Sequence, residues 1–114
     1  MKVRHPVLDW TEEAFQNEVI SAAKGLGFTK IYHTHDSRRS PAGFPDLVLV
    51  HPRRGVIFAE LKSERGRVSD AQQAWLEDLR AAGQVAYVWR PMDWVTGRVQ
   101  SALAGKEVAR AGAR

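Results

Sequence analysis

Cysteine is absent from this 114-residue sequence, and its absence excludes several kinds of site. A chain without cysteine has no disulfide framework, no thiolate zinc site and no cysteine nucleophile. The four histidines, His5, His33, His35 and His51, lack the spacing and helical context of a zinc motif. A fold stabilised by disulfides or zinc is therefore not expected.

A signal peptide and long hydrophobic runs are also missing. No apolar run approaches the roughly 18 residues that are needed to cross a bilayer. We therefore expect no membrane association and a location in the reducing cytoplasm.

The length and the charge of the chain indicate the number of domains and the kind of binding partner. A chain of 114 residues fits one domain that can bury a single core. The formal net charge is +4 and the sequence pI is about 9.9, which favours contact with polyanions. Part of this excess lies near the C-terminus, at Arg98, Lys106, Arg110 and Arg114, where it has the alternative interpretation of a solvated tail.

Hydrophobic periodicity and turn residues predict an α/β chain with the order helix, three strands, helix, strand, helix. The expected elements are a helix from Asp9 or Thr11 to about Gly25–Gly27, strands over 28–35, 45–50 and 55–62, a helix over 69–83, a strand over 84–91 and a last helix over 92–105. The tail over 106–114 is expected to fray. Both faces of the 45–50 strand are apolar, so the strands on either side of the 51–55 turn are expected to be central.

Three charged residues, Asp46, Glu60 and Lys62, interrupt this apolar strand pair. Side chains alternate along a strand, so Glu60 and Lys62 share one face. The register of the hairpin decides whether Asp46 joins them. A three-residue loop over 52–54 places Asp46 opposite Glu60, and a loop over 53–55 places it opposite Lys62. An even-numbered loop sends Asp46 to the other face, and the sequence leaves these alternatives open.

Two carboxylates that face each other across a ladder need a positive partner. They repel, and burial of either without a partner costs roughly several kcal/mol. Lys62 can neutralise one of them, whereas a divalent cation bound by carboxylate oxygens would satisfy both. The structural alternative is an ion pair at the end of the sheet, with Lys62 reaching solvent.

The two longer helices each carry a polar residue on the face expected to point inward. Glu12 falls within the apolar stripe of the first helix, and Gln72 occupies the same kind of position in the second. Both residues also fit capping boxes, Asp9-x-x-Glu12 and Ser69-x-x-Gln72, in which the side chain returns to the backbone of the cap. Because both residues lie on the inward face of their helix, the alternative that they belong to a functional site is favoured.

The ordered motifs resemble the PD-(D/E)xK nuclease superfamily, and within it the small stand-alone members of the virus-type replication-repair nuclease (VRR-NUC) family. The similarity extends from about Thr11 to Pro91 and rests on "TEEAFQNEVI", "HTHDSRRSPAGFPDLVLV", "FAELKSERGRVSDAQQAWLEDLRAAG" and "VAYVWRP". It implies one nuclease domain over 1–114. Its core, over about 10–91, would have the order αβββαβ with a mixed sheet flanked by helices, and a C-terminal helix and tail would follow over 92–114.

The resemblance also implies roles for individual residues. Asp46 and Glu60 would bind Mg²⁺ or Mn²⁺, together with the backbone carbonyl of Leu61, and Lys62 would be the catalytic lysine. Glu12 would be the acid of the first helix and a further candidate metal ligand, and Gln72 would be the glutamine of the second helix. An additional DNA-binding domain, as in the larger members, is not expected in this chain.

Two loops beside the expected site carry candidate DNA-binding residues: Ser37, Arg38, Arg39, Arg65 and Arg67. Guanidinium groups bind phosphates without reading bases. The alternative for each arginine is a solvated loop. Arg53 and Arg54, at the turn of the hairpin, are expected to be remote from the chemistry.

The preferred interpretation is a metal-dependent DNA endonuclease that acts on branched DNA such as junctions and flaps, as the resemblance implies. One alternative is a restriction-like or host-DNA-degrading endonuclease that cuts linear duplex. Another is a DNA-binding module without catalysis, whose acidic residues are purely structural. We expect a homodimer, because two cuts in a junction require two sites. The resemblance further suggests a phage or prophage origin and action in a bacterial host.

Overall fold

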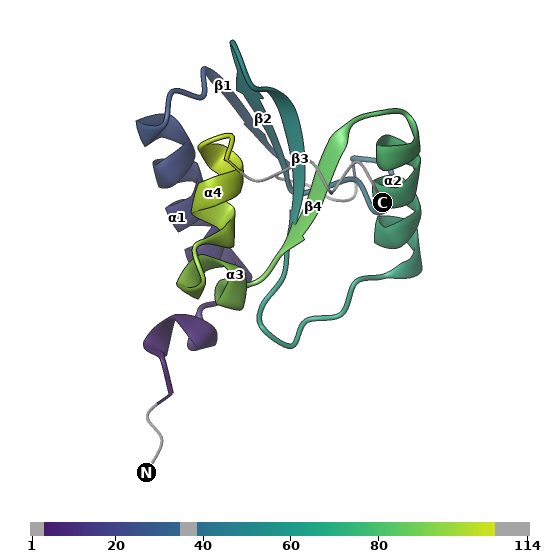
Figure 1. Ribbon diagram of the computed structural model, residues 1–114. Coiled ribbons are helices and arrows are strands. Elements are labelled where there is room, and N and C mark those ends of the chain that lie inside the picture. Colours follow the sequence, from purple (N-terminus) through teal and green to yellow (C-terminus); the bar gives the residue numbers. More distant parts are fainter. Residues whose placement is uncertain (1–3, 35–38, 107–114) are drawn as a thin grey trace.

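The structure of the protein is a computed structural model, which describes residues 4–34 and 39–106. A four-stranded sheet lies between helices (Figure 1). The elements in chain order are the 3-10 helix η1 (Pro6–Asp9), α1 (Glu12–Gly25), β1 (Lys30–His33), β2 (Leu47–His51), β3 (Gly55–Leu61), α2 (Asp70–Ala81), β4 (Val85–Trp89), α3 (Pro91–Val95) and α4 (Arg98–Leu103). No helix within the described ranges is long and apolar enough to cross a lipid bilayer.

The sheet has the order β1-β2-β3-β4, so the two strands of the charged hairpin are central, as expected. β1, β2 and β3 are antiparallel neighbours, whereas β4 runs parallel to β3. A parallel neighbour requires a crossover, which α2 provides. His51 pairs with Gly55, so the turn between β2 and β3 is the three-residue loop over 52–54.

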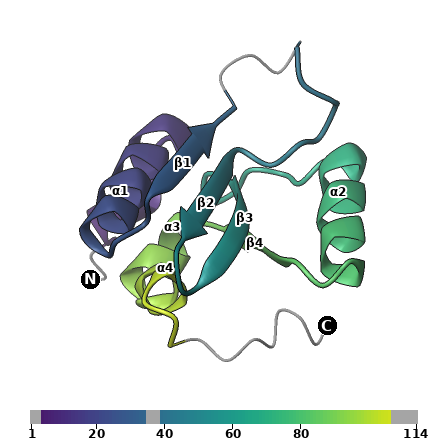
Figure 2. The same ribbon diagram turned by 90° about the horizontal axis from the view of Figure 1, so that it is seen from above.

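The helices form two unequal layers. α1, α3 and α4 cover one face of the sheet, and α2 covers the other (Figure 2). Alternate strand residues such as Leu47, Leu49 and Leu61 are buried against Phe15 and Val19 of α1. Burial of side chains of this size stabilises the fold by about 1.5–3 kcal/mol each. The main core therefore lies on the α1 side, and the charged residues of the hairpin point away from it.

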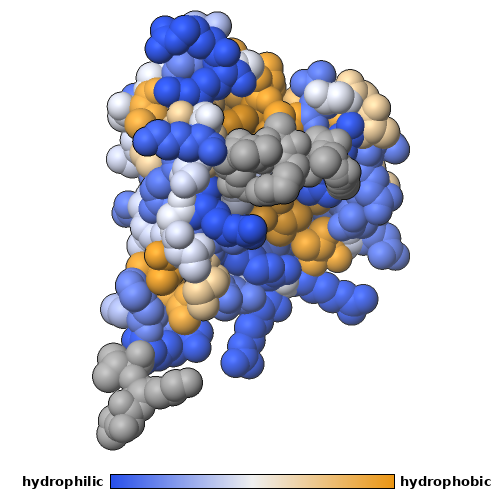
Figure 3. All heavy atoms as spheres, viewed as in Figure 1, coloured by the Kyte–Doolittle hydropathy of each residue, from blue (hydrophilic) through white to orange (hydrophobic). Residues whose placement is uncertain are grey.

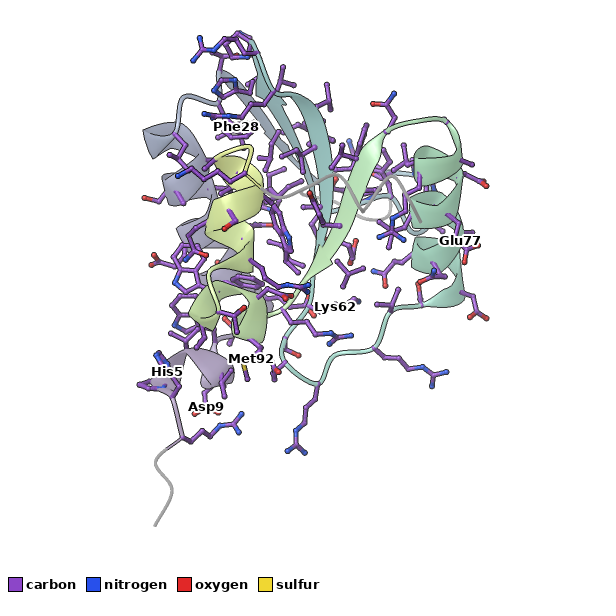
Figure 4. All side chains as sticks on the ribbon, in the orientation of Figure 1. His5, Asp9, Phe28, Lys62, Glu77 and Met92 are labelled. Atoms are coloured by element: carbon purple, nitrogen blue, oxygen red, sulfur yellow. The ribbon has the colours of Figure 1, made fainter. Side chains whose placement is uncertain are left out.

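The start of α1 shows whether Glu12 forms a capping box with Asp9. Thr11 is the N-cap, and its side chain accepts a hydrogen bond from the N–H of Ala14 at 3.0 Å. Asp9 lies instead on η1 (Figure 4), where its carboxylate pairs with Arg4. The capping box between Asp9 and Glu12 that the sequence suggested is therefore wrong, because the chain makes a separate 3-10 turn before the helix begins.

The single C-terminal helix expected over 92–105 is also wrong, because the segment forms two short helices. Pro91 begins α3, where its fixed φ suits the first turn. Gly97, at φ 82°, adopts the left-handed conformation that separates α3 from α4. This bend lets Val99 and Leu103 of α4, both fully buried, complete the core beyond residue 91.

Candidate active site

Asp46 and Glu60 meet at the end of the central hairpin. Leu47 pairs with Ala59, so one further step of this register places Asp46 opposite Glu60. The N–H of Leu61 donates to Oδ2 of Asp46 at 2.9 Å, which holds the carboxyl at the end of the ladder. Of the registers that the sequence left open, the one with the loop over 52–54 is confirmed.

The Asp46 position is fixed by its neighbours on both sides. Pro45 is fully buried, and its carbonyl accepts a hydrogen bond from the hydroxyl of Thr34 at 3.0 Å. The N–H of Thr34 donates to the Asp46 carbonyl at 3.0 Å. The two hydrogen bonds from Thr34, which follows β1, therefore fix the backbone on which the Asp46 side chain stands.

Glu60 is a buried acid with incomplete hydrogen bonding. Its exposed fraction is 2%. Oε2 accepts a hydrogen bond from Nε2 of Gln72 at 2.7 Å and lies 3.7 Å from Nζ of Lys62. Oε1 is buried and has no hydrogen-bond partner among the described residues. A buried acceptor without a partner is uncommon in folded proteins and marks a place where a ligand would be stabilised.

The electrostatics of Glu60 follow from this position. Burial, and next the negative charge of Asp46, raise the pKa of Glu60 from 4.5 to about 8, although the nearby charge of Lys62 acts in the opposite direction. The proximity of the Asp46 carboxyl to that of Glu60 and the charge of Glu12 raise the pKa further. At pH 7 the acid pair therefore retains a proton unless a further cation replaces it.

Lys62 follows β3 directly, at the end of the sheet from which the loop to α2 departs (Figure 4). Its exposed fraction is 9%, and its backbone N–H donates to the carbonyl of Trp89 at 3.0 Å. The buried position does not match the alternative in which Lys62 reaches solvent. One ammonium group beside two carboxyls leaves an excess of acid at this end of the sheet.

Gln72 completes the predicted capping box and also contacts Glu60. Its Oε1 accepts from the N–H of Ser69 at 2.8 Å, and Ser69 Oγ accepts from the Gln72 N–H at 3.1 Å, which completes the capping box of α2. Its Nε2 donates to Glu60. Gln73, by contrast, points outward and bonds to Glu77. The N-terminus of α2 therefore holds Glu60 in place.

Glu12 lies at the first turn of α1 and is exposed. It lines a pocket of ≈ 290 Å³ together with Glu13, Gln16, His33, Asp46 and Leu61. An atom at a Cβ position on Gly66 would lie 3.5 Å from Oε2 of Glu12, so the carboxylate approaches the loop that follows Lys62. The structure thus brings Glu12 to the same pocket as Asp46.

Sequence reasoning missed Gln16 and the contact that it makes with His33. The exposed fraction of Gln16 is 9%, and its Nε2 lies 2.8 Å from Nε2 of His33 at the end of β1. Gln16 follows Glu12 by one helical turn and is polar within an apolar stripe, a signal that the sequence contained. His33 carried no comparable signal, because its contact spans 17 positions along the chain.

The donor set suits a small divalent cation. Asp46 and Glu60 offer hard oxygen ligands, and Oε1 of Glu60 has no partner among the described residues. Within residues 4–34 and 39–106 no group of three His, Asp or Glu side chains is arranged to hold a metal. A cation here would complete its shell with a backbone carbonyl, water and substrate oxygens, as Mg²⁺ commonly does.

The structure describes three of the five candidate DNA-binding residues. Arg39 is exposed in the segment before β2, and Arg65 and Arg67 are exposed in the loop after Lys62. Hydrophilic side chains gather over this second loop, between β3 and α2 (Figure 3). Ser37 and Arg38 lie outside the described residues.

Hydrogen bonds from the Arg90 side chain fix the backbone of the loop that follows Lys62. Nη1 of Arg90 donates to the carbonyls of Ser63, Glu64 and Gly66 at 3.0, 3.3 and 2.6 Å. The loop therefore has a fixed backbone while Arg65 and Arg67 remain exposed.

Comparisons with known proteins agree with this arrangement. The VRR-NUC domain matches residues 2–92. A solved structure described as a VRR_NUC domain protein is 25% identical, has a TM-score of 0.64, and covers 82% of this chain and 90% of that chain. The Fanconi-associated nuclease 1 homolog of Schizosaccharomyces pombe is 34% identical over 62 residues, which are 52% of this chain and 9% of that protein. The chain therefore spans less than a tenth of this curated relative, and it belongs to the VRR-NUC family of nuclease domains.

Proposed function

We propose that this chain is a Mg²⁺- or Mn²⁺-dependent DNA endonuclease that acts on branched DNA. The observation that carries the proposal is the facing of Asp46 and the buried Glu60, where the pKa of Glu60 is raised to about 8 and its Oε1 has no hydrogen-bond partner among the described residues. Such a pair destabilises the metal-free fold unless a cation completes it. Family membership supports nuclease activity.

In this proposal Asp46, Glu60 and the Leu61 carbonyl hold the metal, and Glu12 is a further ligand or holds a bound water. When bound, a divalent ion lowers the pKa of water and offsets the negative charge that develops on the phosphate. The reaction is hydrolysis: water oxygen bonds to phosphorus and the water loses a proton, the bond to the leaving sugar oxygen breaks, and that oxygen gains a proton, so that the protons balance.

The protein side chains supply the remaining functions. Lys62, which is buried beside Glu60, would donate to the reacting phosphate or to the attacking water and place positive charge there. Gln72 would keep Glu60 Oε2 in one orientation through its 2.7 Å hydrogen bond. Both roles depend on short, buried contacts that are already formed in the protein alone.

Substrate selection would follow DNA shape. Arg39, Arg65 and Arg67 are exposed in loops on the two sides of the acid pair, where they would bind phosphates of neighbouring strands. Contacts of this kind hold a backbone without reading bases, and so favour a particular arrangement of strands. A symmetric homodimer would place a second acid pair on the opposite strand of a junction.

The test uses the purified chain with labelled linear, flap, Y-shaped and four-way DNA in Mg²⁺, Mn²⁺ or EDTA. The proposal predicts cleavage of branched DNA with either metal and none in EDTA. Sequence-specific cleavage of linear duplex would instead indicate a restriction-like enzyme. Binding that is independent of metal, with no cleavage of any DNA, would indicate a non-catalytic module.

A further inference from the structure

Gln16 is a buried amide on an otherwise apolar face of α1. Its neighbours on this side, Phe15 and Val19, are fully buried, and the exposed fraction of Gln16 is 9%. An amide that leaves water loses hydrogen bonds, and an apolar residue of similar size would suit the core better. A core position alone therefore does not account for glutamine here.

His33 sets the position of this amide. Nε2 of Gln16 lies 2.8 Å from Nε2 of His33. A carboxamide has two N–H donors and one acceptor oxygen, so pairing with one ring nitrogen leaves at least one N–H available in either orientation of the amide. The pair thus fixes Gln16 and still leaves it a donor.

The pocket that contains Gln16 is rich in acceptors. Three carboxylates, those of Glu12, Glu13 and Asp46, line it together with Leu61. The non-bridging oxygens of a phosphodiester are acceptors only, so a phosphate in this pocket needs a donor from the protein. Lys62 does not line this pocket, and a neutral amide provides a donor without adding a second positive charge beside the carboxylates.

We propose that Gln16, oriented by His33, donates a hydrogen bond to a non-bridging oxygen of the scissile phosphodiester. The inference rests on the proposed nuclease function, since it names a further residue that contacts the same substrate. It makes Gln16 a catalytic residue and His33 a positioning residue.

The first experiment compares Gln16→Met with Gln73→Met. Methionine has a similar size and no donor. Gln73 is exposed, and its Nε2 donates to Oε2 of Glu77 at 3.0 Å. We expect Gln16→Met to keep or raise the Tm and to lower kcat/KM about 10- to 100-fold, the effect of one hydrogen bond to a charged group. Gln73→Met should retain full cleavage. If Gln16→Met does not fold, Gln16→Glu keeps the size and an acceptor but lacks the N–H, and should show the same loss.

The second experiment identifies the contacted atom. Sulfur replaces each non-bridging oxygen of the scissile phosphate in turn, giving two diastereomeric substrates. Sulfur accepts hydrogen bonds weakly, so the rate penalty for one diastereomer should be smaller in Gln16→Met than in the unaltered chain. The penalty for the other diastereomer should be the same in both proteins.

The outcomes separate this inference from the nuclease proposal. Full cleavage by folded Gln16→Met, or a loss of Tm with unchanged activity per folded molecule, would overturn the role of Gln16 and leave the nuclease proposal standing. Identical diastereomer penalties in both proteins would also overturn the contact. Absence of cleavage by the unaltered chain with Mg²⁺ and Mn²⁺ would overturn both.

Discussion

The two ends of the β2–β3 hairpin both bury polar groups, but they satisfy them differently. At the turn, His51 is 4% exposed, and its Nδ1 accepts from the N–H groups of Arg53 and Arg54 at 3.1 and 3.2 Å. Nη1 of Arg54 donates to the carbonyls of Leu26 and Leu103, both at 3.2 Å. These contacts join the turn to α1 and α4.

At the other end, Glu60 has a comparable burial and an unpartnered Oε1 within the described part of the chain. Asp46 faces it with a like charge, and Lys62 compensates only one of the two. Satisfied polar groups stabilise a fold, whereas unsatisfied ones lower its stability and persist where a ligand completes them. The contrast therefore distinguishes a structural end of the hairpin from the end that we propose to be functional.

The largest expected effect comes from removing charge at the functional end. Asp46→Asn and Glu60→Gln should each lower cleavage by about 10³-fold or more, because the site loses a carboxylate that would hold the metal ion. The Tm of the metal-free protein at pH 8 should stay the same or rise, since like-charge repulsion disappears. Gel assays of cleavage and thermal unfolding in EDTA measure the two quantities. A variant that cuts normally would remove this end of the hairpin from the mechanism.

The structural end should respond in the opposite way. Arg54→Met leaves two carbonyls without their donor, so the free energy of unfolding should fall by about 2–3 kcal/mol. Cleavage per folded molecule should not change. Urea unfolding gives the first quantity, and an assay under stabilising conditions gives the second. Arg53→Met, at the neighbouring exposed arginine, is the matched control, and an equal destabilisation in both variants would argue against the carbonyl contacts of Arg54.

The two ends should also have opposite pH dependence. Because the pKa of Glu60 rises from 4.5 to about 8 on folding, the folded state binds more protons between these values. Glu60 therefore contributes stability below pH 4.5 that is lost as pH rises to about 8. Burial, followed by the charge of Arg54, lowers the pKa of His51 below 6.5, so its contribution is lost as pH falls from 6.5.

Thermal unfolding of the metal-free protein between about pH 5 and 9 tests this difference. Glu60→Gln should remove the decline in Tm at higher pH and leave the decline at lower pH. Mn²⁺ should raise the Tm of the unaltered chain more at pH 8 than at pH 6, because binding must displace the proton on the acid pair. A Tm that responds to Mn²⁺ equally at both values would show that no such proton exists.

The smallest effects are expected from the exposed arginines near the functional end. Arg65→Gln and Arg67→Gln should each weaken DNA binding severalfold for every sequence, and each should reduce the slope of log K against log salt by about 1. The Tm should not change. Fluorescence anisotropy at several salt concentrations measures the slope. Arg53→Gln, at the far end of the hairpin, is the control, and an equal change there would indicate only general charge attraction.

Much of this arrangement was predictable from local sequence. The periodicity of apolar residues located both long helices and the four strands, and side-chain alternation placed Glu60 and Lys62 on one face. The predicted dual character of Gln72 was also visible, because a capping position at the start of a helix is set by neighbours three residues apart. The break between α3 and α4 was missed, although Gly97 marks it.

Other features depend on contacts between distant segments. The sequence allowed several hairpin registers, and only the pairing of His51 with Gly55 decided that Asp46 faces Glu60. The contact of Gln16 with His33 requires α1 to pack beside the end of β1. Neither feature has a periodic signal that reasoning along the chain would detect.

The sequence by itself determined which residues alternate on each strand and which helical faces are apolar, because both follow from the repeat of the backbone. Only the tertiary structure decided that Glu60 is 2% exposed and that its pKa rises to about 8. Desolvation and charge repulsion depend on atoms that α2, β2 and the first helix bring from elsewhere in the chain. Local patterns in the sequence therefore identify candidate site residues, whereas the chemistry of those residues depends on the folded molecule.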